Sequence, residues 1–398
     1  MNTKLISKRV AAIKPSPTLV IDAKAKTLKQ QGVDILNFAP GEPDFDTPSN
    51  IKNAGIHAII NGYTKYCPVG GTPELKDAVI KKFERDNNLQ YAQNEILVSC
   101  GAKHSIYNLL QTIIDDGDEV IIPAPFWVSY PDMVIIAGGK PIIVSADDKS
   151  GFKVNAKQIK EAVTEKTKAI IINSPSNPTG AAYTAAELQE IADICLEKDI
   201  LIIADDIYEK LVYDGFKFTS VASLSPKIKE KTIVVNGLSK AYSMTGWRIG
   251  FAAGNKEIIA GMSKVQSQST SNPTSISLKA AVEALNGPQD SVEMMRVEFE
   301  KRRNYILERL LAIKGISCQK PQGAFYVFPN IKEFLGKTIK GKKINTDMDF
   351  ADLMLEEAKI AIVPGSPFGA DGYVRFSYAT SMDNIKEGLD RFERTIKD

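Results

Sequence analysis

The chain has 398 residues, of which 43% are hydrophobic and 25% are charged, the composition of an ordinary globular protein. That length suits two domains, or one large domain with an appendage, and exceeds what a single small core needs. Fifty basic and 48 acidic side chains leave a formal net charge of +2, which gives no electrostatic footprint for nucleic acid or an anionic membrane.

The N-terminus and the cysteines indicate a cytoplasmic protein. No apolar stretch approaches the roughly 20 residues that a membrane-spanning helix needs, and no secretory signal is visible at the start. The cysteines are scattered without CxxC pairing, so we expect free thiols in a reducing compartment: Cys67, Cys100, Cys195 and Cys318. Neither His57 nor His104 has metal-ligand spacing around it, so we expect no metal site.

The middle of the chain alternates short apolar runs with longer amphipathic stretches, the pattern of βαβ units around a mainly parallel sheet. Helices are expected at 104–114 and at 184–199, where Thr184 and Glu187 form a capping box. The strands predicted at 200–205 and 231–237 are apolar on both faces, as strands between two helical layers should be. We expect strands at 95–99, 119–124, 140–146, 168–174, 200–205 and 231–237.

From about residue 288 the pattern changes to that of an α+β unit. It predicts, in order, a helix at 293–313, a strand at 324–330, a helix near 349–358, strands at 360–365 and 373–379, and a closing helix. We therefore expect an α/β protein with helices flanking a mainly parallel sheet, and a smaller α+β domain. The expected parts are an N-terminal arm that adds to the small domain (1–48), a large domain (49–287) and a C-terminal small domain (288–398).

Polar residues follow four of the predicted strands, at the sheet edge where parallel sheets bind ligands. The first of these strands leads into a small-residue turn that opens a helix, and the free amides of such a turn bind anions. The candidate residues at this edge are the turn 100–103, Asn177, Asp205 with Tyr208, and Lys240 with Arg248.

Together these residue types suit pyridoxal phosphate. A lysine amine can form an imine with the aldehyde of this cofactor and then act as a base at the substrate Cα. A carboxylate keeps the ring nitrogen protonated, a phenol and an amide bond O3′, and an arginine with helix-terminal amides binds the phosphate. Each residue alone is weak evidence, because a lone loop lysine is usually solvated and an aspartate after a strand usually forms a turn. The prediction therefore depends on their shared location.

Several motifs resemble one known family. SNPTG (176–180), ADDIYEKL (204–211) and LSKAYSMTGWRIGFAAG (238–254) are similar to the class I aminotransferases of fold-type I. The resemblance runs nearly end to end, through GEPDFDTP (41–48), KYCPVGG (65–71), PFWVSYP (125–131) and VRFSYATS (374–381). The order and spacing of the motifs both match.

The resemblance implies a role for each residue of these motifs that contacts the cofactor ring. Lys240 would be the Schiff-base lysine, and Asp205 would pair with the pyridinium nitrogen. Tyr208 and Asn177 would bond O3′, with Asn177 also contacting the substrate carboxylate, and Trp127 would stack on the ring. Catalysis would then centre on Lys240, Asp205 and Tyr208.

The same resemblance assigns the phosphate and substrate contacts. Arg375 would bind the substrate α-carboxylate in a bidentate contact, and Gly41 would approach the substrate from the arm. Tyr66 would reach the phosphate of a neighbouring subunit, which implies a homodimer with shared sites. The phosphate ligands would be Gly101, Ala102, Lys103, Ser239 and Arg248.

Two positions depart from the family pattern. Gly237 stands where many relatives have a serine that binds the phosphate, so Ser239 or backbone amides would take that contact. Asp206 stands where the family often has glutamate, and we expect little consequence because this second carboxylate is not a cofactor ligand.

The subgroup resembled is that of the bacterial-type aspartate aminotransferases, which includes prephenate aminotransferases. In it, residues at the positions of Lys103 and Ser16 bind the distal carboxylate. A cation is unfavourable beside a helix N-terminus, which favours a functional role for Lys103. We expect ping-pong conversion of L-aspartate and 2-oxoglutarate to oxaloacetate and L-glutamate. The alternatives are an aminotransferase for prephenate, aromatic amino acids, alanine or kynurenine, a C–S lyase, or a non-catalytic binding protein of the same fold.

Overall fold

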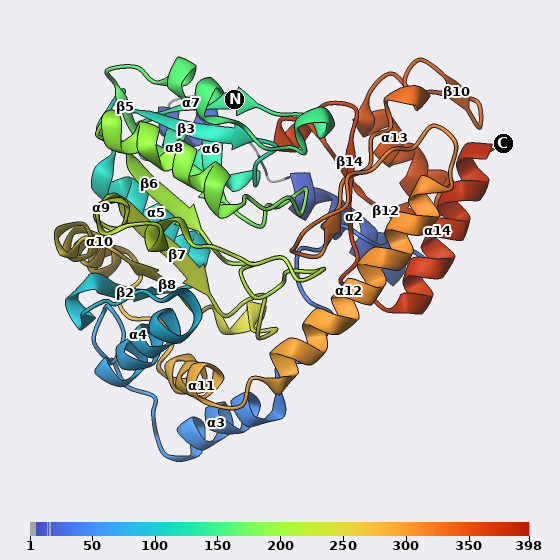
Figure 1. Cartoon of the computed structure of the whole chain (residues 1–398). Coiled ribbons are helices and arrows are strands. Elements are labelled where there is room, and N and C mark those ends of the chain that lie inside the picture. Colours follow the sequence, from blue (N-terminus) through green and yellow to red (C-terminus); the bar gives the residue numbers. More distant parts are fainter. Residues whose placement is uncertain (1–4, 14, 16, 398) are drawn as a thin grey trace.

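The larger part of the molecule is a sheet enclosed by helices (Figure 1). The coordinates are a computed structural model that describes residues 5–13, 15 and 17–397. Among these residues, the largest sheet has seven strands in the order β2-β8-β7-β6-β5-β3-β4. Only β8 runs antiparallel to its neighbours in this described sheet, so the α/β class with a mainly parallel sheet is confirmed. The strands are β2 (Ile96–Ser99), β3 (Glu119–Ala124), β4 (Lys140–Ser145), β5 (Thr167–Asn173), β6 (Leu201–Asp205), β7 (Thr232–Gly237) and β8 (Gly250–Ala253).

The six strands predicted for this sheet are confirmed to within one residue at each end, whereas β8 was missed. Its residues are mostly glycine and alanine, which have low strand propensity. The strand exists because β2 and β7 both pair with it, a long-range effect that the local sequence does not show.

Helices cover both faces of the sheet because successive apolar residues of a strand point to opposite faces. On β6, Ile203 belongs to the core on one face, while Ile202 and Ala204 belong to the core on the other. The first face packs against α5 (Ala102–Ile113), α6 (Ser129–Ile136) and α10 (Lys256–Ser269). The second packs against α3 (Ser49–Ile60), α4 (Pro73–Asn87), α7 (Ala156–Ala162), α8 (Ala185–Glu197), α9 (Pro226–Lys231) and α11 (Ser275–Asn286).

The capping box predicted before α8 is present. The Thr184 hydroxyl accepts the amide of Glu187 at 3.3 Å, and the Glu187 carboxylate accepts the amide of Thr184 at 2.8 Å. Both predicted helices of this region, α5 and α8, are confirmed, and α5 begins two residues earlier than expected.

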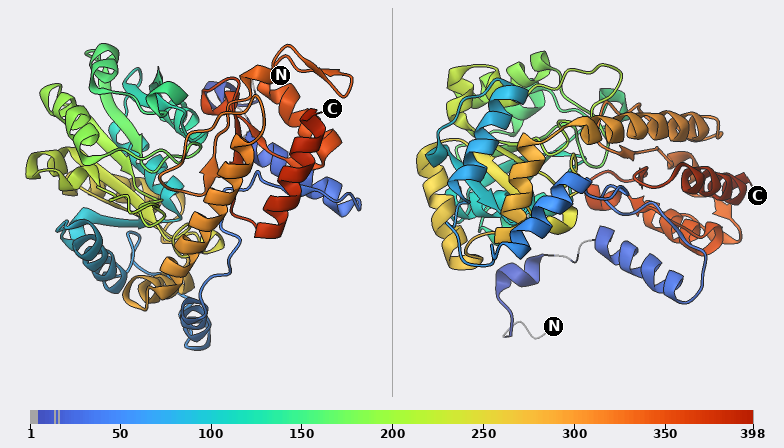
Figure 2. Two further views of the ribbon diagram at one scale, coloured as in Figure 1. Left: turned by 45° about the vertical axis from the view of Figure 1, so that its right-hand side comes forward. Right: turned by 90° about the horizontal axis from the view of Figure 1, so that it is seen from below.

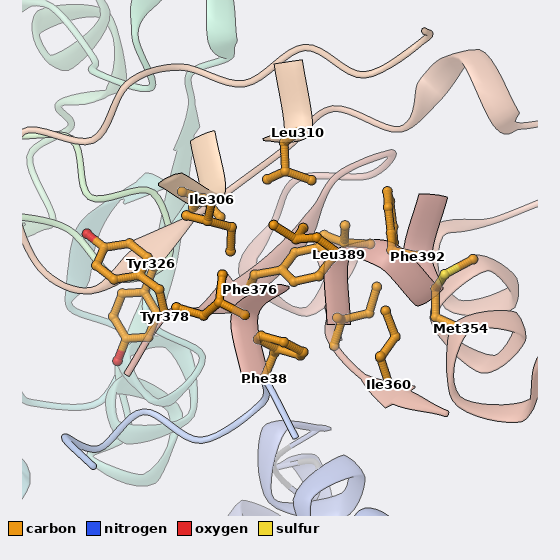
Figure 3. Packing of buried hydrophobic residues seen from close by; sticks show 14 of the residues in the cluster. Phe38, Ile306, Leu310, Tyr326, Met354, Ile360, Phe376, Tyr378, Leu389 and Phe392 are labelled. Atoms are coloured by element: carbon orange, nitrogen blue, oxygen red, sulfur yellow. The ribbon is translucent and has the colours of Figure 1, made fainter. Parts of the chain in front are cut away.

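A second apolar core lies between the C-terminal helices and three short strands (Figure 3). The strands β13, β14 and β9 form an antiparallel sheet in that order. Phe376 of β14 packs edge-on against Phe392 of the last helix and against Phe38 of the arm. The elements are β9 (Tyr326–Val327), β13 (Val363–Pro364), β14 (Val374–Ser377), α12 (Asp290–Leu311), α13 (Asp347–Leu353), a π-helical turn (Met354–Ala358) and α14 (Met382–Lys397), with a hairpin of β10 (Thr338–Ile339) and β11 (Lys342–Lys343).

Two strand predictions in this part are wrong in extent. The strand expected at 324–330 is reduced to Tyr326–Val327, because Pro329 cannot donate to a ladder. The strand expected at 360–365 is divided, because β12 (Ile360–Ala361) pairs with β1 (Leu36–Asn37) of the arm while β13 pairs with β14.

The arm lies against the second core from residue 17 onward (Figure 2), whereas its first helix contacts α6. It contains α1 (Lys8–Ala12) and α2 (Pro17–Gln30), followed by β1, and Phe38 is buried among residues of the C-terminal part. The domain division at 48 and 287 stays a prediction, since residues 207–213 also contribute to the second core. Within the described residues, no helix is both long and apolar enough to span a bilayer.

Candidate active site

A cavity of about 450 Å³ opens where β5, β6 and β7 end, and residues of the arm and of β14 complete its wall. Gly101 directly precedes the lining residue Ala102, whereas Tyr66 is 92% exposed and does not line the cavity of this chain. Ser16 lies outside the described residues. The predicted residues that line the cavity are Gly41, Ala102, Lys103, Trp127, Asn177, Asp205, Tyr208, Ser239, Lys240, Arg248 and Arg375.

The amine of Lys240 lies inside the cavity, where its Nζ donates a hydrogen bond to the carbonyl of Gly41. The pKa of Lys240 is lowered to about 8, mainly by burial and also by the charges of Arg375 and Arg248, while Glu42 and Asp205 oppose the shift. The result is an amine that can lose its proton near neutral pH.

The carboxylate of Asp205 is held by a residue that sequence analysis missed. The Tyr130 hydroxyl donates to Oδ2 at 2.6 Å, and the amide of Ile207 donates to Oδ1 at 3.4 Å. Burial raises the pKa of Asp205 to about 6, and the bond from Tyr130 opposes that rise. Tyr130 also packs edge-on against Trp127, with ring centroids 5.3 Å apart. Its place in the motif PFWVSYP, three residues after Trp127, was the signal available in the sequence.

The turn before α5 is shaped for an anion. Gly101 has a φ of +91°, and a Cβ there would lie 2.5 Å from Nη2 of Arg248, so another residue would be strained and would clash. Gly101 caps the helix without a side chain, which leaves first-turn amides for a ligand. Arg248 donates to the carbonyls of Thr245 and Cys100 at 2.9 and 3.3 Å, which aims its guanidinium across this turn.

Lys103 lies in the first turn of α5, beside the indole of Trp127. Its Nζ lies 4.7 Å from the ring centroid, a cation–π contact. Burial of the amine and the charge of Arg248 both lower the pKa of Lys103. Lys103 therefore brings a cation to the cavity wall next to the aromatic ring.

Arg375 is a buried cation without a carboxylate partner among the described residues. Its side chain is 1% exposed, Nη1 donates to Oδ1 of Asn177 at 2.9 Å, Nη2 donates to the carbonyl of Ala39, and Nε has no partner there. The guanidinium stacks 4.6 Å from the ring of Tyr326, whose hydroxyl lies 2.8 Å from that of Tyr208. A buried, unpaired guanidinium is unfavourable until an anion binds it, so this corner of the cavity is suited to a carboxylate.

Comparison with known proteins bears directly on this geometry. Residues 33–392 match the sequence model of the family described as aminotransferase class I and II. The chain belongs to this aminotransferase family. The resemblance inferred from the motifs is therefore confirmed over most of the sequence.

Relatives of this aminotransferase-family chain match it over nearly its full length. It is 53% identical over 394 residues to a protein named aspartate aminotransferase from Bacillus sp. (strain YM-2), covering 99% of this chain and 100% of the relative. It is 51% identical over 392 residues to a probable aspartate/prephenate aminotransferase from Rickettsia bellii (strain RML369-C), covering 98% of each.

Solved structures of aminotransferases share the fold. The crystal structure of an aspartate aminotransferase from Rhizobium meliloti superposes with a TM-score of 0.95 at 46% identity, covering 98% of both chains. The aspartate aminotransferase from Thermus thermophilus with maleate gives a TM-score of 0.93 at 43% identity, covering 98% of this chain and 99% of that one.

The cavity of this aminotransferase fold also includes residues that the sequence did not single out. Tyr326 and Asn173 line it, and so does Glu42, whose carboxylate accepts a bond from the Thr245 hydroxyl at 3.0 Å. Glu42 lies inside the GEPDFDTP motif, directly after Gly41, so its position beside a candidate residue was the available signal. Tyr326 had no comparable signal, because it enters the site from the C-terminal part.

Proposed function

We propose that this chain is an aspartate aminotransferase that uses pyridoxal 5′-phosphate to exchange an amino group between L-aspartate and 2-oxoglutarate. One observation carries the proposal: a single cavity holds a buried amine, a buried carboxylate bonded to a phenol, and a buried guanidinium without an acidic partner among the described residues. The names of the relatives from Bacillus and Rhizobium support the choice of aspartate.

The residues of the cavity fit the cofactor. Lys240 would hold it covalently through the amine, and Asp205 would face the ring nitrogen. When bound, pyridoxal phosphate supplies a ring that accepts the electron pair released at the substrate Cα. The remaining contacts would come from Trp127 on the ring face, Asn177 and Tyr208 at O3′, and Ser239, Arg248 and the amides of 101–103 at the phosphate.

The chain's own residues would move and hold protons at defined atoms. Burial lowers the pKa of the Lys240 amine to about 8, which makes its proton easier to lose and suits a general base at the substrate Cα. With a pKa of about 6, Asp205 is mostly ionised at pH 7, so it can hold a proton on the ring nitrogen. The hydroxyl of Tyr130 keeps this carboxylate in place.

The substrate would be held at its two carboxylates. Arg375 would take the α-carboxylate in a planar fork, using donors that the described residues leave available, and Gly41 would let the arm approach closely. Lys103, with Ser16, would take the distal carboxylate of a dicarboxylic substrate. The cation of Lys103 lies on the cavity wall beside Trp127, which supports this assignment.

We further propose a cytoplasmic homodimer in which Tyr66 reaches the phosphate site of the partner subunit. Tyr66 is 92% exposed, and three isoleucines of α3 are also exposed: Ile56 (51%), Ile59 (56%) and Ile60 (76%). Exposed apolar residues close together in the chain support an interface with another protein chain. We expect no nucleic acid and no membrane among the partners.

Prephenate is a second candidate substrate, supported by the name of the relative from Rickettsia bellii. Aromatic amino acids, alanine, kynurenine and a C–S lyase reaction remain further alternatives. Kinetics on a panel of amino donors, with prephenate as an acceptor, separates these possibilities.

The visible spectrum of the purified protein tests the main proposal. We expect a cofactor absorbance band that bleaches when aspartate is added and changes little when alanine is added. Equal bleaching by both amino acids would overturn the choice of aspartate. Absence of any cofactor band after addition of pyridoxal phosphate would overturn the cofactor assignment as well.

A further inference from the structure

Asn173 connects the two loops that carry the cofactor and substrate residues. It is the last residue of β5 and lines the cavity. Its Nδ2 donates to the carbonyl of Asp205 at 2.9 Å, and its Oδ1 accepts the amide of Asn177 at 2.9 Å. Both ends of one side chain are thus used, one on each loop.

The connection continues into the C-terminal part and the arm. Oδ1 of Asn177 accepts from Nη1 of Arg375 at 2.9 Å, and Nη2 of Arg375 donates to the carbonyl of Ala39. A continuous line of hydrogen bonds therefore runs from the carboxylate-bearing residue Asp205 to the arm. Asn173 is the member of that line that joins the ring end of the cavity to the guanidinium end.

The sequence of the loop explains why a side chain has this task. Pro175 and Pro178 have no amide hydrogen, so neither can tie the segment to its neighbours through a backbone donor. The amide of Ser176 is bonded to the carbonyl of Ala181, within the same loop. The bond from the Asn177 amide to Asn173 connects the middle of the loop to the end of the sheet.

We propose that Asn173 is a positioning residue that sets the separation between the cofactor carboxylate, Asp205, and the substrate-binding guanidinium, Arg375, by holding Asn177. The inference rests on the proposed function. Asn173 acts through Asn177 and through the backbone of Asp205, so its loss should affect where a substrate carboxylate is held more than it affects the chemistry at the amine. A purely structural bond at a strand end would lower stability and leave ligand affinity unchanged.

The experiment compares Asn173→Ala with Asn255→Ala. Asn255 caps α10 and accepts two backbone amides, at 2.8 and 3.4 Å, so the two variants each lose two hydrogen bonds of one asparagine. The readouts are the thermal midpoint of cofactor-free protein, the dissociation constant of maleate followed by cofactor absorbance, and KM and kcat for aspartate. If Asn173→Ala does not fold, Asn173→Ser takes its place with the same expectations.

We expect both variants to lower the thermal midpoint, and only Asn173→Ala to weaken maleate binding, by about tenfold for one lost positioning bond. KM for aspartate should rise by a similar factor while kcat changes less. In an Asn177→Ala background, adding Asn173→Ala should change maleate affinity less than twofold, because the two act in one line.

The inference is overturned if maleate binds Asn173→Ala as tightly as it binds Asn255→Ala. It is also overturned if the Asn173 and Asn177 changes have fully additive effects on maleate affinity. The unmodified protein serves as the reference for the underlying function. If it fails to bind maleate or to show a cofactor band, the proposed function itself fails, which is a different result from a wild-type-like Asn173 variant.

Discussion

Residues 205–209, at the end of β6 and directly after it, have two faces on which charged side chains have different surroundings. Asp205 and Tyr208 lie on the cavity face, whereas Asp206 and Glu209 lie on the opposite face and are absent from the cavity lining that the described residues form. On the cavity face the nearby guanidinium of Arg375 keeps an Nε without a partner among those residues.

The opposite face is a closed network. Glu209 pairs with the ammonium of Lys82 and accepts bonds from Asn87 at 2.7 Å and Asn236 at 2.9 Å. The side chains of Lys82 and Glu209 are only 4% and 5% exposed. Asp206 accepts the hydroxyl of Ser220 at 2.6 Å.

This difference separates two uses of buried charge. Charges that find partners within the chain fix the position of the segment, and charges that lack them are available to a ligand. The adjacent residues Asp205 and Asp206 each accept a bond from one hydroxyl, yet only Asp205 lines the cavity. Substitutions on each face should therefore change different measured quantities.

The largest effect is expected on the cavity face, for Lys240→Ala. Loss of the amine removes both the covalent attachment and the base, so turnover should fall by more than about 10⁴-fold. Steady-state kinetics and the cofactor absorbance band are the measurements. Lys153→Ala is the control, because Lys153 pairs with Glu187 outside the cavity lining. A Lys240→Ala protein that retains turnover would refute the role.

On the opposite face, Lys82→Met should act on stability. It leaves Glu209 as an unpaired buried charge, which costs on the order of 3–5 kcal/mol of unfolding free energy. Urea unfolding measures the loss. Adding Glu209→Gln to the same protein should recover part of it, because no unpaired charge then remains. A single variant as stable as the wild type would contradict a structural role for the pair.

Tyr130→Phe tests the support of the cavity carboxylate. The Tyr130 hydroxyl holds the pKa of Asp205 down, so its removal should raise that pKa above about 6, by up to about one unit for one hydrogen bond. Activity should then be lost at a higher pH on the acid side, with little change at pH 8. An unchanged acid limb in the pH profile of kcat/KM would exclude this effect.

Asp206→Asn should have the smallest effect, visible in the pH dependence of stability. Burial raises the pKa of Asp206 to about 8, so the folded state binds a proton that the unfolded state releases between about pH 4 and pH 8. Wild-type stability contributed by this group is present at low pH and is lost as the pH rises to about 8. The variant should therefore gain stability relative to the wild type as the pH rises over that range. Equal slopes in both proteins would rule this out.

The sequence predicted features that depend on local pattern or on strand ends. The sheet strands, the capping box at Thr184 and the shared edge of Lys240, Asp205 and Asn177 all follow from periodicity and from where polar residues come after apolar runs. Parallel strands bring such ends together whatever the intervening sequence.

What the sequence did not reveal depends on contacts between distant segments. Tyr130 and Asp205 are 75 positions apart, and Asn87 and Glu209 are 122 apart. The motif ADDIYEKL selected Asp205 as the cavity carboxylate, but it did not show that Glu209 faces Lys82 and Asn87 of α4, because that follows from the packing of other elements. The extent of the short C-terminal strands was misjudged for the same reason, since β12 takes its partner from the arm.

The pairing of β1 with β12 has a consequence for the amine of Lys240. Within a few residues of Gly41, the amide of Phe38 bonds the carbonyl of Ala361 at 2.8 Å and the amide of Ser377 bonds the carbonyl of Phe38 at 2.9 Å. The chain leading to Gly41 is thus attached to the C-terminal strands and must travel with them. A tilt of those strands would move the Gly41 oxygen and the neighbouring Glu42 carboxylate, whose charge raises the pKa of Lys240, so the seating of the C-terminal part is coupled to the proton on that amine.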